Sequence, residues 1–299
     1  MAYALLDEDR TLGEALRRIA GEQIDEALDA IVPGHPSRAV HEVRRRTKTL
    51  RGLIRLMRIG FDEFADADAA IRAIARPLSE TRDAKVMLDT LEALSHQAAG
   101  KAARHMLRRI HSHLASEREA EREAERVEDL LDKSKDRLRA LKARAEFWTV
   151  DGDGWDVVGE GAAITYGHML KDGARALADG RPQDFHELRK HVRYHWCHAR
   201  LLRKLWPEEM DARAMVADDL AHTLGHHHDL AVLNARLVKD GIHFGTGEEL
   251  APVFALAERQ GSALEDRARM LCERLLAESR EAFTERWHAL WKAWEAARA

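Results

Sequence analysis

The residues of this sequence best suited to chemistry form a strip of positive charge. Residues 40–58 (VHEVRRRTKTLRGLIRLMR) contain six Arg, one Lys and one His, with Glu42 as the single acid. On an α-helix, where successive residues are ~100° apart, most of these cations fall within an arc of about 100°. The residues on this arc are His41, Arg44, Lys48, Arg51, Arg55 and Arg58. The apolar residues roughly opposite are Val43, Leu50, Leu53, Ile54 and Met57. We therefore expect a helix that packs by its apolar face and presents cations along about 25 Å of its length.

The strip differs from a solvated charged helix in the signs of its charges. Residues 117–129 (EREAEREAERVED) interleave acids and Arg, which relieves repulsion and is typical of a helix face in contact with water. Residues 40–58 instead place like charges on successive turns, at a cost of roughly a few tenths of a kcal/mol per pair. A solvated surface remains the alternative interpretation, but the uncompensated charge favours a bound anion.

The strip occurs twice, at matching places in the chain. Residues 41–58 align with residues 186–203 (HELRKHVRYHWCHARLLR) at an offset of 145. Downstream, residues 78–88 (LSETRDAKVML) align with residues 224–234 (LGHHHDLAVLN) at an offset of 146. The basic residues expected on one face of the second strip are His186, Arg189, Lys190, Arg193, Arg200, Arg203 and Lys204. The shared order and spacing predict a tandem duplication, whose two basic helices, related by a pseudo-twofold axis, could line one groove.

The elements that must position these strips are helices. Of the 299 residues, 45% are apolar and 33% charged, while only 18 are Gly and 6 are Pro, which is typical of long helices with solvated faces. The 6% of aromatic residues argues against a β-sandwich or barrel. The expected helices are 10–31, 36–60, 63–98 with a kink at Pro77, 101–148, 155–180, 182–205, 208–240 and 248–296. We expect an all-α fold of two four-helix bundles, 1–149 and 155–299, joined by a linker at 150–154 around the DGDG sequence, with long protruding helices.

Net charge and targeting signals indicate which partners and which location to expect. The net charge of −4 gives no global reason to expect a polyanion partner, so any such site must be local. The N-terminus has no basic region followed by an apolar stretch, and no run approaches the ~18 apolar residues of a membrane helix. The two cysteines, Cys197 and Cys272, form no spaced motif and are expected to be reduced thiols. We expect a cytoplasmic protein without a membrane partner.

The residue types of the strips narrow the class of anion. Arg dominates the first strip, and its planar guanidinium binds phosphate oxygens in pairs. A long linear strip suits an extended polyanion better than a single phosphate. Nucleic-acid binders add aromatic side chains on which bases stack. The first strip has none, whereas the second contains Tyr194 and Trp196, so nucleic acid stays an alternative partner.

Histidines offer a rival chemistry. Two sets fall on single helix faces and could ligate zinc or another transition metal. The sets are His191, His195 and His198, and His222, His226 and Asp229. A di-iron bundle site would need two Glu-x-x-His motifs, and only Glu285–His288 is present. We find no nucleophile–base pair, no phosphate-cradling glycine loop and no cluster of carboxylates for magnesium. We therefore expect no metal, no cofactor and no catalysis.

The paired motifs resemble the CHAD family, named for its conserved histidine α-helical domain. Each half carries a His-x-x-Arg-x-x-x-Lys/Arg helix followed by a Leu-x-x-x-Arg/His-Asp-x-x-Val helix, and the resemblance spans about residues 8–296. It implies two four-helix bundles with a pseudo-twofold axis and binding of inorganic polyphosphate on a basic central surface. It also implies association with polyphosphate granules; some members are fused to a triphosphate-processing CYTH domain, but this chain is expected to be a stand-alone copy.

The resemblance and the two strips together nominate the ligands of polyphosphate. The candidates are His41, Arg44, Arg45, Lys48, Arg51, Arg55, Arg58, Arg82, Lys85, His186, Arg189, Lys190, Arg193, Arg200, Arg203, Lys204 and His228. Asp83 and Asp229 are expected to orient the basic residues. Trp196 stands where the first strip has Arg51, so the second strip departs from the family pattern. Phosphate-bound histidines would gain charge below about pH 6.5, so binding should strengthen in mild acid. The alternatives are a nucleic-acid-binding or protein-interaction scaffold and a metal-dependent phosphohydrolase.

Overall fold

The regular structure of the chain is helical throughout its described part. The computed structural model describes residues 3–120 and 124–298, while the side chains of residues 80–84, 117–120, 124–126 and 242 lie outside the described part. No strand occurs in these residues, which confirms the predicted all-α class. The first six helices are α1 (Leu12–Asp29), α2 (Pro36–Leu56), α3 (Phe64–Ala75), α4 (Pro77–Gln97), α5 (Lys101–Ala120) and α6 (Ala124–Ala145). The remaining elements are α7 (Trp155–Asp179), α8 (Pro182–Leu201), the 3-10 turn η1 (Arg203–Leu205), α9 (Pro207–Lys239), α10 (Gly241–Phe244), α11 (Gly247–Leu275) and α12 (Arg280–Arg298).

Proline and glycine set the ends of the helices that matter most for the site. Pro36 and Pro182 open the two basic helices, α2 and α8, at a position where the missing N–H would have had no partner within the helix. Pro77 begins α4 and interrupts the helical run at the expected place. Gly180 ends α7 with φ 64°, a left-handed conformation that favours glycine. The sharp turn at Gly180 lets α8 fold back along α7.

Several expected helices are shorter than the sequence pattern predicts. The range 36–60 ends at Leu56, so Arg58 lies beyond α2. The range 182–205 ends as an α-helix at Leu201 and continues as the turn η1, so Arg203 does not extend the face of α8. The range 248–296 divides into α11 and α12. The Oγ of Ser279 accepts from the N–H of Ala282 (3.2 Å) and so caps the start of α12. The tract 117–129, expected to project as a solvated helix, lies largely outside the described side chains.

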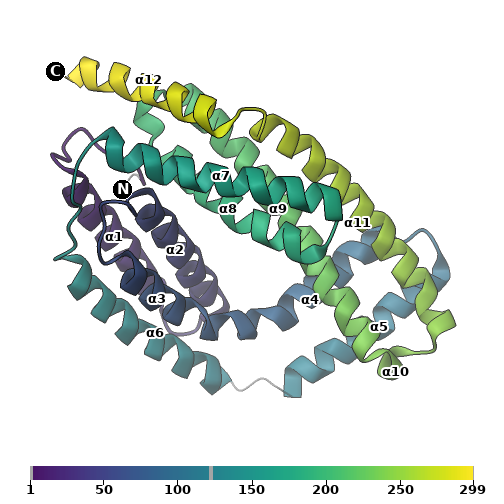
Figure 1. Ribbon diagram of the computed structural model, residues 1–299. Helices are drawn as coiled ribbons and strands as arrows, with labels where there is room; N and C mark the ends of the chain where they lie inside the picture. Colours follow the sequence, from purple (N-terminus) through teal and green to yellow (C-terminus); the bar gives the residue numbers. More distant parts are fainter. Residues whose placement is uncertain (1–2, 121–123, 299) are drawn as a thin grey trace.

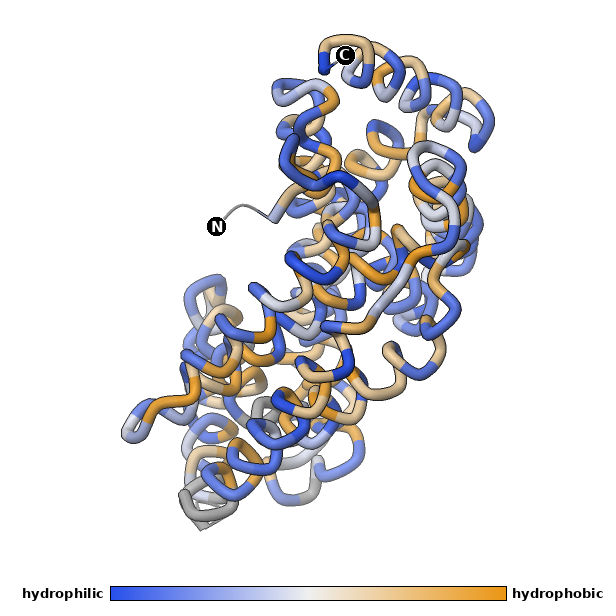
Figure 2. The backbone as a smooth tube through the Cα atoms, turned by 90° about the vertical axis from the view of Figure 1, so that its left-hand side faces the viewer, coloured by the Kyte–Doolittle hydropathy of each residue, from blue (hydrophilic) through white to orange (hydrophobic). Residues whose placement is uncertain are grey.

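The buried side chains form three clusters rather than one core for each half. The first joins α1, α2, α3 and α6 to parts of α7, α8 and α12. The second lies between α7, α8, α9 and α11. The third joins α4 and α5 to the C-terminal part of α9 and the N-terminal part of α11. Figure 1 shows α4, α5 and α10 gathered at one end of the molecule, and Figure 2 shows hydrophobic and hydrophilic residues alternating along the helices. The two halves of the chain therefore share a core at this end.

The apolar face predicted for the first basic helix is buried. The side chains concerned are Val43, Leu50, Leu53, Ile54 and Met57, each with 0% of its surface exposed. Their burial holds α2 in the first cluster and turns its cationic face away from that core. The face assignment made from helical spacing is confirmed.

Candidate anion-binding cleft

The two basic helices meet at a glycine. Gly52 of α2 lies against Cys197 of α8, and a Cβ at Gly52 would stand 2.4 Å from the Cβ of Cys197. Nε2 of His198 in α8 lies 3.1 Å from the carbonyl oxygen of Gly52 and joins the helices by a hydrogen bond. Positions 52 and 197 are equivalent at the 145-residue offset, so the contact falls where a pseudo-twofold axis would pass. The duplication itself stays a prediction.

The two basic faces line one cavity, which we call the central cleft. Its volume is about 420 Å³, and its walls come from α2, α4, α8 and α9. The basic and histidine side chains that line it are His41, Arg44, Lys48, Arg51, His186, Arg189, Lys190, Arg193, His222 and His228. Asp229 is the one carboxylate among the described lining residues. Six Arg and Lys side chains against one lining carboxylate make the cleft positive.

One buried acid on the neighbouring helix α3 positions arginines of the wall formed by α2. Asp68 of α3 accepts hydrogen bonds from Arg51 (2.8 Å) and Arg55 (2.9 Å) and lies 3.3 Å from Arg72. Burial alone would raise the pKa of Asp68, but the hydrogen bonds from Arg55 and Arg51 lower it below its usual value. One carboxylate thus holds three guanidinium groups and leaves a net positive charge. At the other end of the wall, Nη1 of Arg44 donates to the Ser79 hydroxyl.

Two cations of the wall formed by α8 pair with acids of their own. Nη1 of Arg193 lies 2.7 Å from Asp218, and Lys190 forms an ion pair with Glu187 one turn away. Among the described residues, Glu187 pairs with Lys190 alone, and Asp218 pairs with Arg193 and His222. The field that this wall directs into the cleft is therefore weaker than its number of cations suggests.

Two imidazoles lie in contact on the wall of the cleft. The rings of His186 on α8 and His228 on α9 have centroids 4.6 Å apart. Burial lowers the pKa of His186, and the neighbouring His228 and Lys190 lower it further. Its Nδ1 is buried without a hydrogen-bond partner in the described part of the chain. An anion bound here would accept a hydrogen bond from Nδ1–H and would favour the protonated ring.

The aromatic rings of the second strip are covered by guanidinium groups. Arg55 lies over the Tyr194 ring at 4.2 Å from its centroid, and Arg51 at 5.7 Å. Arg193 lies 4.2 Å from the centroid of Trp196 and Arg200 lies 5.0 Å from it. Tyr194 is buried, with 6% of its surface exposed. These rings orient arginines through cation–π contacts and are not presented as platforms for bases.

Several predicted ligands lie outside the lining of the central cleft. Arg45 pairs with Glu42 (2.7 Å), Arg203 with Asp211 (2.7 Å) and Lys204 with Asp7 (3.2 Å). Arg55 and Arg200 are stacked beside the cleft as described, and Arg58 lies 5.1 Å from the centroid of Phe64. Arg203 and Lys204 point elsewhere because α8 ends at Leu201.

The downstream motif lines the cleft from both α4 and α9. His228 and Asp229 line the cleft, as do Val86 and Met87 of α4. Lys85 is exposed and is not among the lining residues. The predicted ligand Arg82 and the neighbouring Asp83 lie outside the described side chains.

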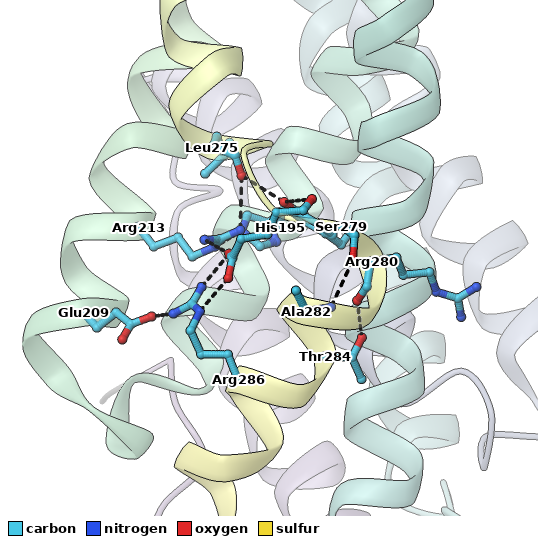
Figure 3. Close-up of polar contacts among 11 residues, drawn as sticks. His195, Glu209, Arg213, Leu275, Ser279, Arg280, Ala282, Thr284 and Arg286 are labelled. Carbon is cyan, nitrogen blue, oxygen red and sulfur yellow. Dashed lines mark hydrogen bonds and ion pairs between the residues drawn. The ribbon is translucent and has the colours of Figure 1, made fainter.

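The histidines proposed as metal ligands point to different environments. His191 binds Asp172 (Nδ1–Oδ2, 2.7 Å), and Nε2 of His195 accepts a hydrogen bond from Nε of Arg213 (2.7 Å). Figure 3 shows His195 and Arg213 in a network that continues through Arg286 to Glu209. His198 binds the Gly52 carbonyl. Across residues 3–120 and 124–298, no group of three or more His, Cys, Asp or Glu side chains is arranged to hold a metal ion.

Comparison with known proteins identifies the family. The model of the CHAD domain family matches residues 12–238. The chain belongs to the CHAD domain family. This CHAD domain is similar to the crystal structure of the CHAD domain from the plant Ricinus communis, with a TM-score of 0.62 and 18% identity over 97% of this chain and 94% of that one. It is also similar to PptA from Streptomyces chartreusis, with a TM-score of 0.61 and 14% identity over 90% of this chain and 100% of that one. A comparison with curated protein sequences found no match.

The structural similarity extends the CHAD domain beyond the matched sequence. The family match ends at residue 238, whereas the likeness to the plant domain covers almost the whole chain. At these identities the likeness shows the fold.

None of the helices in the described residues has the length and apolar character to cross a membrane.

Sequence reasoning missed one residue that supports the cleft of this CHAD domain and one that lines it. Asp68 organises Arg51 and Arg55 and had no place in the prediction. It lies on the same face of α3 as the buried Ile71, and an acid on an apolar face signals a buried cation partner. His222 was considered only as a metal ligand, but it lines the cleft six residues before His228.

Proposed function

We propose that this CHAD domain binds inorganic polyphosphate in the central cleft without catalysing its turnover. The observation that carries the proposal is the convergence of basic faces from α2 and α8 on one cavity. A polyphosphate chain presents charged oxygens at every phosphate, and Arg and Lys on two opposed walls bind such oxygens from several directions.

The shape of the basic surface favours an extended ligand. The cations that line the cleft on α2 run from His41 to Arg51, which is about 15 Å at ~1.5 Å per residue. That length exceeds a single phosphate group. Arg55 continues the same helix face beyond the lining, and Arg58 follows in the turn after α2, so both add positive charge near this end of the cleft.

The covered aromatic rings favour polyphosphate over single-stranded nucleic acid. Nucleic acid would gain much of its affinity from bases stacked on exposed rings. Tyr194 is buried and Trp196 is occupied by Arg193 and Arg200. Polyphosphate needs only spaced cations. Association with polyphosphate granules would follow from the same binding.

A competition experiment tests the proposal. Labelled long-chain polyphosphate bound to the protein is titrated with unlabelled polyphosphate or single-stranded RNA at equal phosphate concentration. We expect polyphosphate to displace the label at far lower concentration, and the affinity to fall steeply with salt, by analogy with counterion release from DNA. Displacement by RNA at the lower concentration would instead identify a nucleic-acid-binding protein. Phosphate release that depends on added Mg²⁺ or Mn²⁺ would identify a phosphohydrolase.

A further inference from the structure

A second cavity lies at the end of the molecule formed by α4, α5 and α10. We call it the distal pocket. It has a volume of about 540 Å³ and lies between α5 and α10. The polar residues that line it are His105, Arg108, Arg109, Ser112, His113 and His243. None of these residues belongs to the central cleft.

The spacing of the α5 residues gathers them on one helix face. Positions 105, 108, 109, 112 and 113 follow the helical repeat, so their side chains project from one side of α5. His243 reaches the same pocket from α10, where Phe244 is buried beside it. The His113 ring lies 5.2 Å from Phe244 in an edge-on contact and 6.2 Å from His243 in a nearly parallel one. The packing of Phe244 therefore holds the His113 imidazole on the pocket wall, and the His243 ring lies nearly parallel to it.

The charged side chains that line the pocket are the two arginines Arg108 and Arg109. Nη1 of Arg109 lies 3.2 Å from Glu249, whose other oxygen accepts from the backbone N–H of Thr246 in the capping box of α11. Arg108 donates weakly to the Arg104 carbonyl (3.4 Å) on its own helix. No carboxylate is among the described residues that line the pocket.

We propose that the distal pocket is a second anion site, which binds a phosphate group independently of the central cleft. Two guanidinium groups, a hydroxyl and imidazoles from two helices can donate to a tetrahedral phosphate from several directions, whereas a planar carboxylate accepts mainly in its own plane. The adjacent Arg108 and Arg109 disfavour a metal cation among the histidines. Two sources supply such a group: a small molecule such as pyrophosphate and the end of a long polyphosphate chain.

Calorimetric titration with pyrophosphate tests this site in a protein whose central cleft is disabled. The background is the full chain with Arg44→Glu and Lys48→Glu. We expect this protein to retain one binding event. Adding Arg108→Gln should weaken that event at least about tenfold, because a charge-assisted hydrogen bond contributes strongly to binding. Adding Arg104→Gln instead is the matched control, since it removes an exposed arginine from the same helix that does not line the pocket. It should change the affinity less than about twofold.

Further titrations determine which class of anion binds in the distal pocket. Citrate should bind at least about tenfold more weakly than pyrophosphate if donor geometry selects phosphate. Binding of long-chain polyphosphate in the same background would assign chain ends to the pocket, and binding of pyrophosphate alone would assign small phosphates. The proposal is overturned if the disabled background binds no pyrophosphate, if Arg104→Gln weakens binding as much as Arg108→Gln, or if citrate binds equally well. These outcomes are independent of whether the central cleft binds polyphosphate.

Discussion

The two walls of the central cleft have similar sequence patterns but differ in the continuity of their cationic faces and in the residues that they bury. On α2 the cationic face is continuous from Arg44 to Arg51, and the opposite face buries only aliphatic residues and small side chains. On α8 the cationic face is interrupted at Trp196, and the helix buries His195 and His198 in its core.

The acids that hold the described cations differ between the two walls. Asp68 is shared by Arg51 and Arg55 of α2 and by Arg72 of its own helix, α3. On α8, Lys190 and Arg193 pair with separate acids. We infer that α2 supplies most of the binding energy, whereas α8 supplies structure and a smaller part of the field.

Reversing charge on the α2 wall should have the largest effect. Arg44→Glu with Lys48→Glu places two carboxylates in the cleft, and we expect polyphosphate affinity to fall by at least about 100-fold, as for buried charge pairs elsewhere. The matched control is Arg203→Glu with Lys204→Glu, which changes charge equally but outside the cleft. Fluorescence anisotropy of labelled polyphosphate measures both. Equal losses in the two variants would mean that overall charge, not the cleft, governs binding.

Separating the two walls should cost stability. Gly52→Ala places a Cβ 2.4 Å from the Cβ of Cys197, and we expect it to lower the free energy of unfolding by about 1–3 kcal/mol through overpacking. Gly21→Ala is the control, because a Cβ at Gly21 meets nothing within 4 Å. In the middle of α1 it should raise stability by about 0.5–1 kcal/mol. Urea unfolding measures both, and a neutral Gly52→Ala would contradict the close crossing.

The buried histidines of α8 should make folding sensitive to acid. Burial lowers the pKa of His198 from 6.5 to about 3. Below about pH 6.5 the unfolded chain takes up a proton that the folded protein does not, so the free energy of unfolding should fall by about 2 kcal/mol between pH 7 and pH 5 from His198 alone. Burial, and then the charge of Arg213, also lower the pKa of His195, which adds to the loss. Urea unfolding of His198→Gln should show a shallower pH dependence; an unchanged slope would contradict this assignment.

Neutralising the α8 wall should weaken binding less than neutralising the α2 wall. Lys190→Gln with Arg193→Gln removes cations that already pair with Glu187 and Asp218, so we expect a loss of about threefold to tenfold. Arg44→Gln with Lys48→Gln removes the same number of charges from α2 and should cause the larger loss. The comparison of the walls fails if the α8 variant is the weaker binder at the same salt concentration.

The smallest expected effect is the contribution of His186 to the pH dependence of binding. Burial and neighbouring positive charge lower the pKa of His186, so the ring is neutral in the free protein at pH 7.5. A bound polyanion favours the protonated ring, so affinity should rise by about threefold as the pH falls to 6. Anisotropy titrations of His186→Gln at the two pH values should show a smaller rise, and an equal rise would assign the effect to other groups.

The sequence predicted the buried face of each basic helix better than its end. Helical spacing placed Leu50 and Leu53 in the core, where the structure has them. The same spacing placed Arg58 and Arg203 on the two helices, but each helix ends two residues earlier, and Arg203 pairs with Asp211. Periodicity assumes that the helix continues, and no Gly or Pro marks the end of α8 before Pro207.

The partners of the cations lay beyond sequence reasoning. The repeat predicted that the two strips share a groove, and both strips do line the central cleft. Which acid holds each cation depends on packing between distant segments. Asp68 meets Arg51 across 17 residues, and Asp218 meets Arg193 across 25, at distances that no local pattern sets.

A crystal structure of the protein with a short polyphosphate chain tests the central claim most directly. The account predicts phosphate groups between α2 and α8, within hydrogen-bond distance of Arg44, Lys48 and Arg189. Phosphate groups bound only on the outer faces, at Arg203 and Lys204 for example, with none in the central cleft, would contradict it.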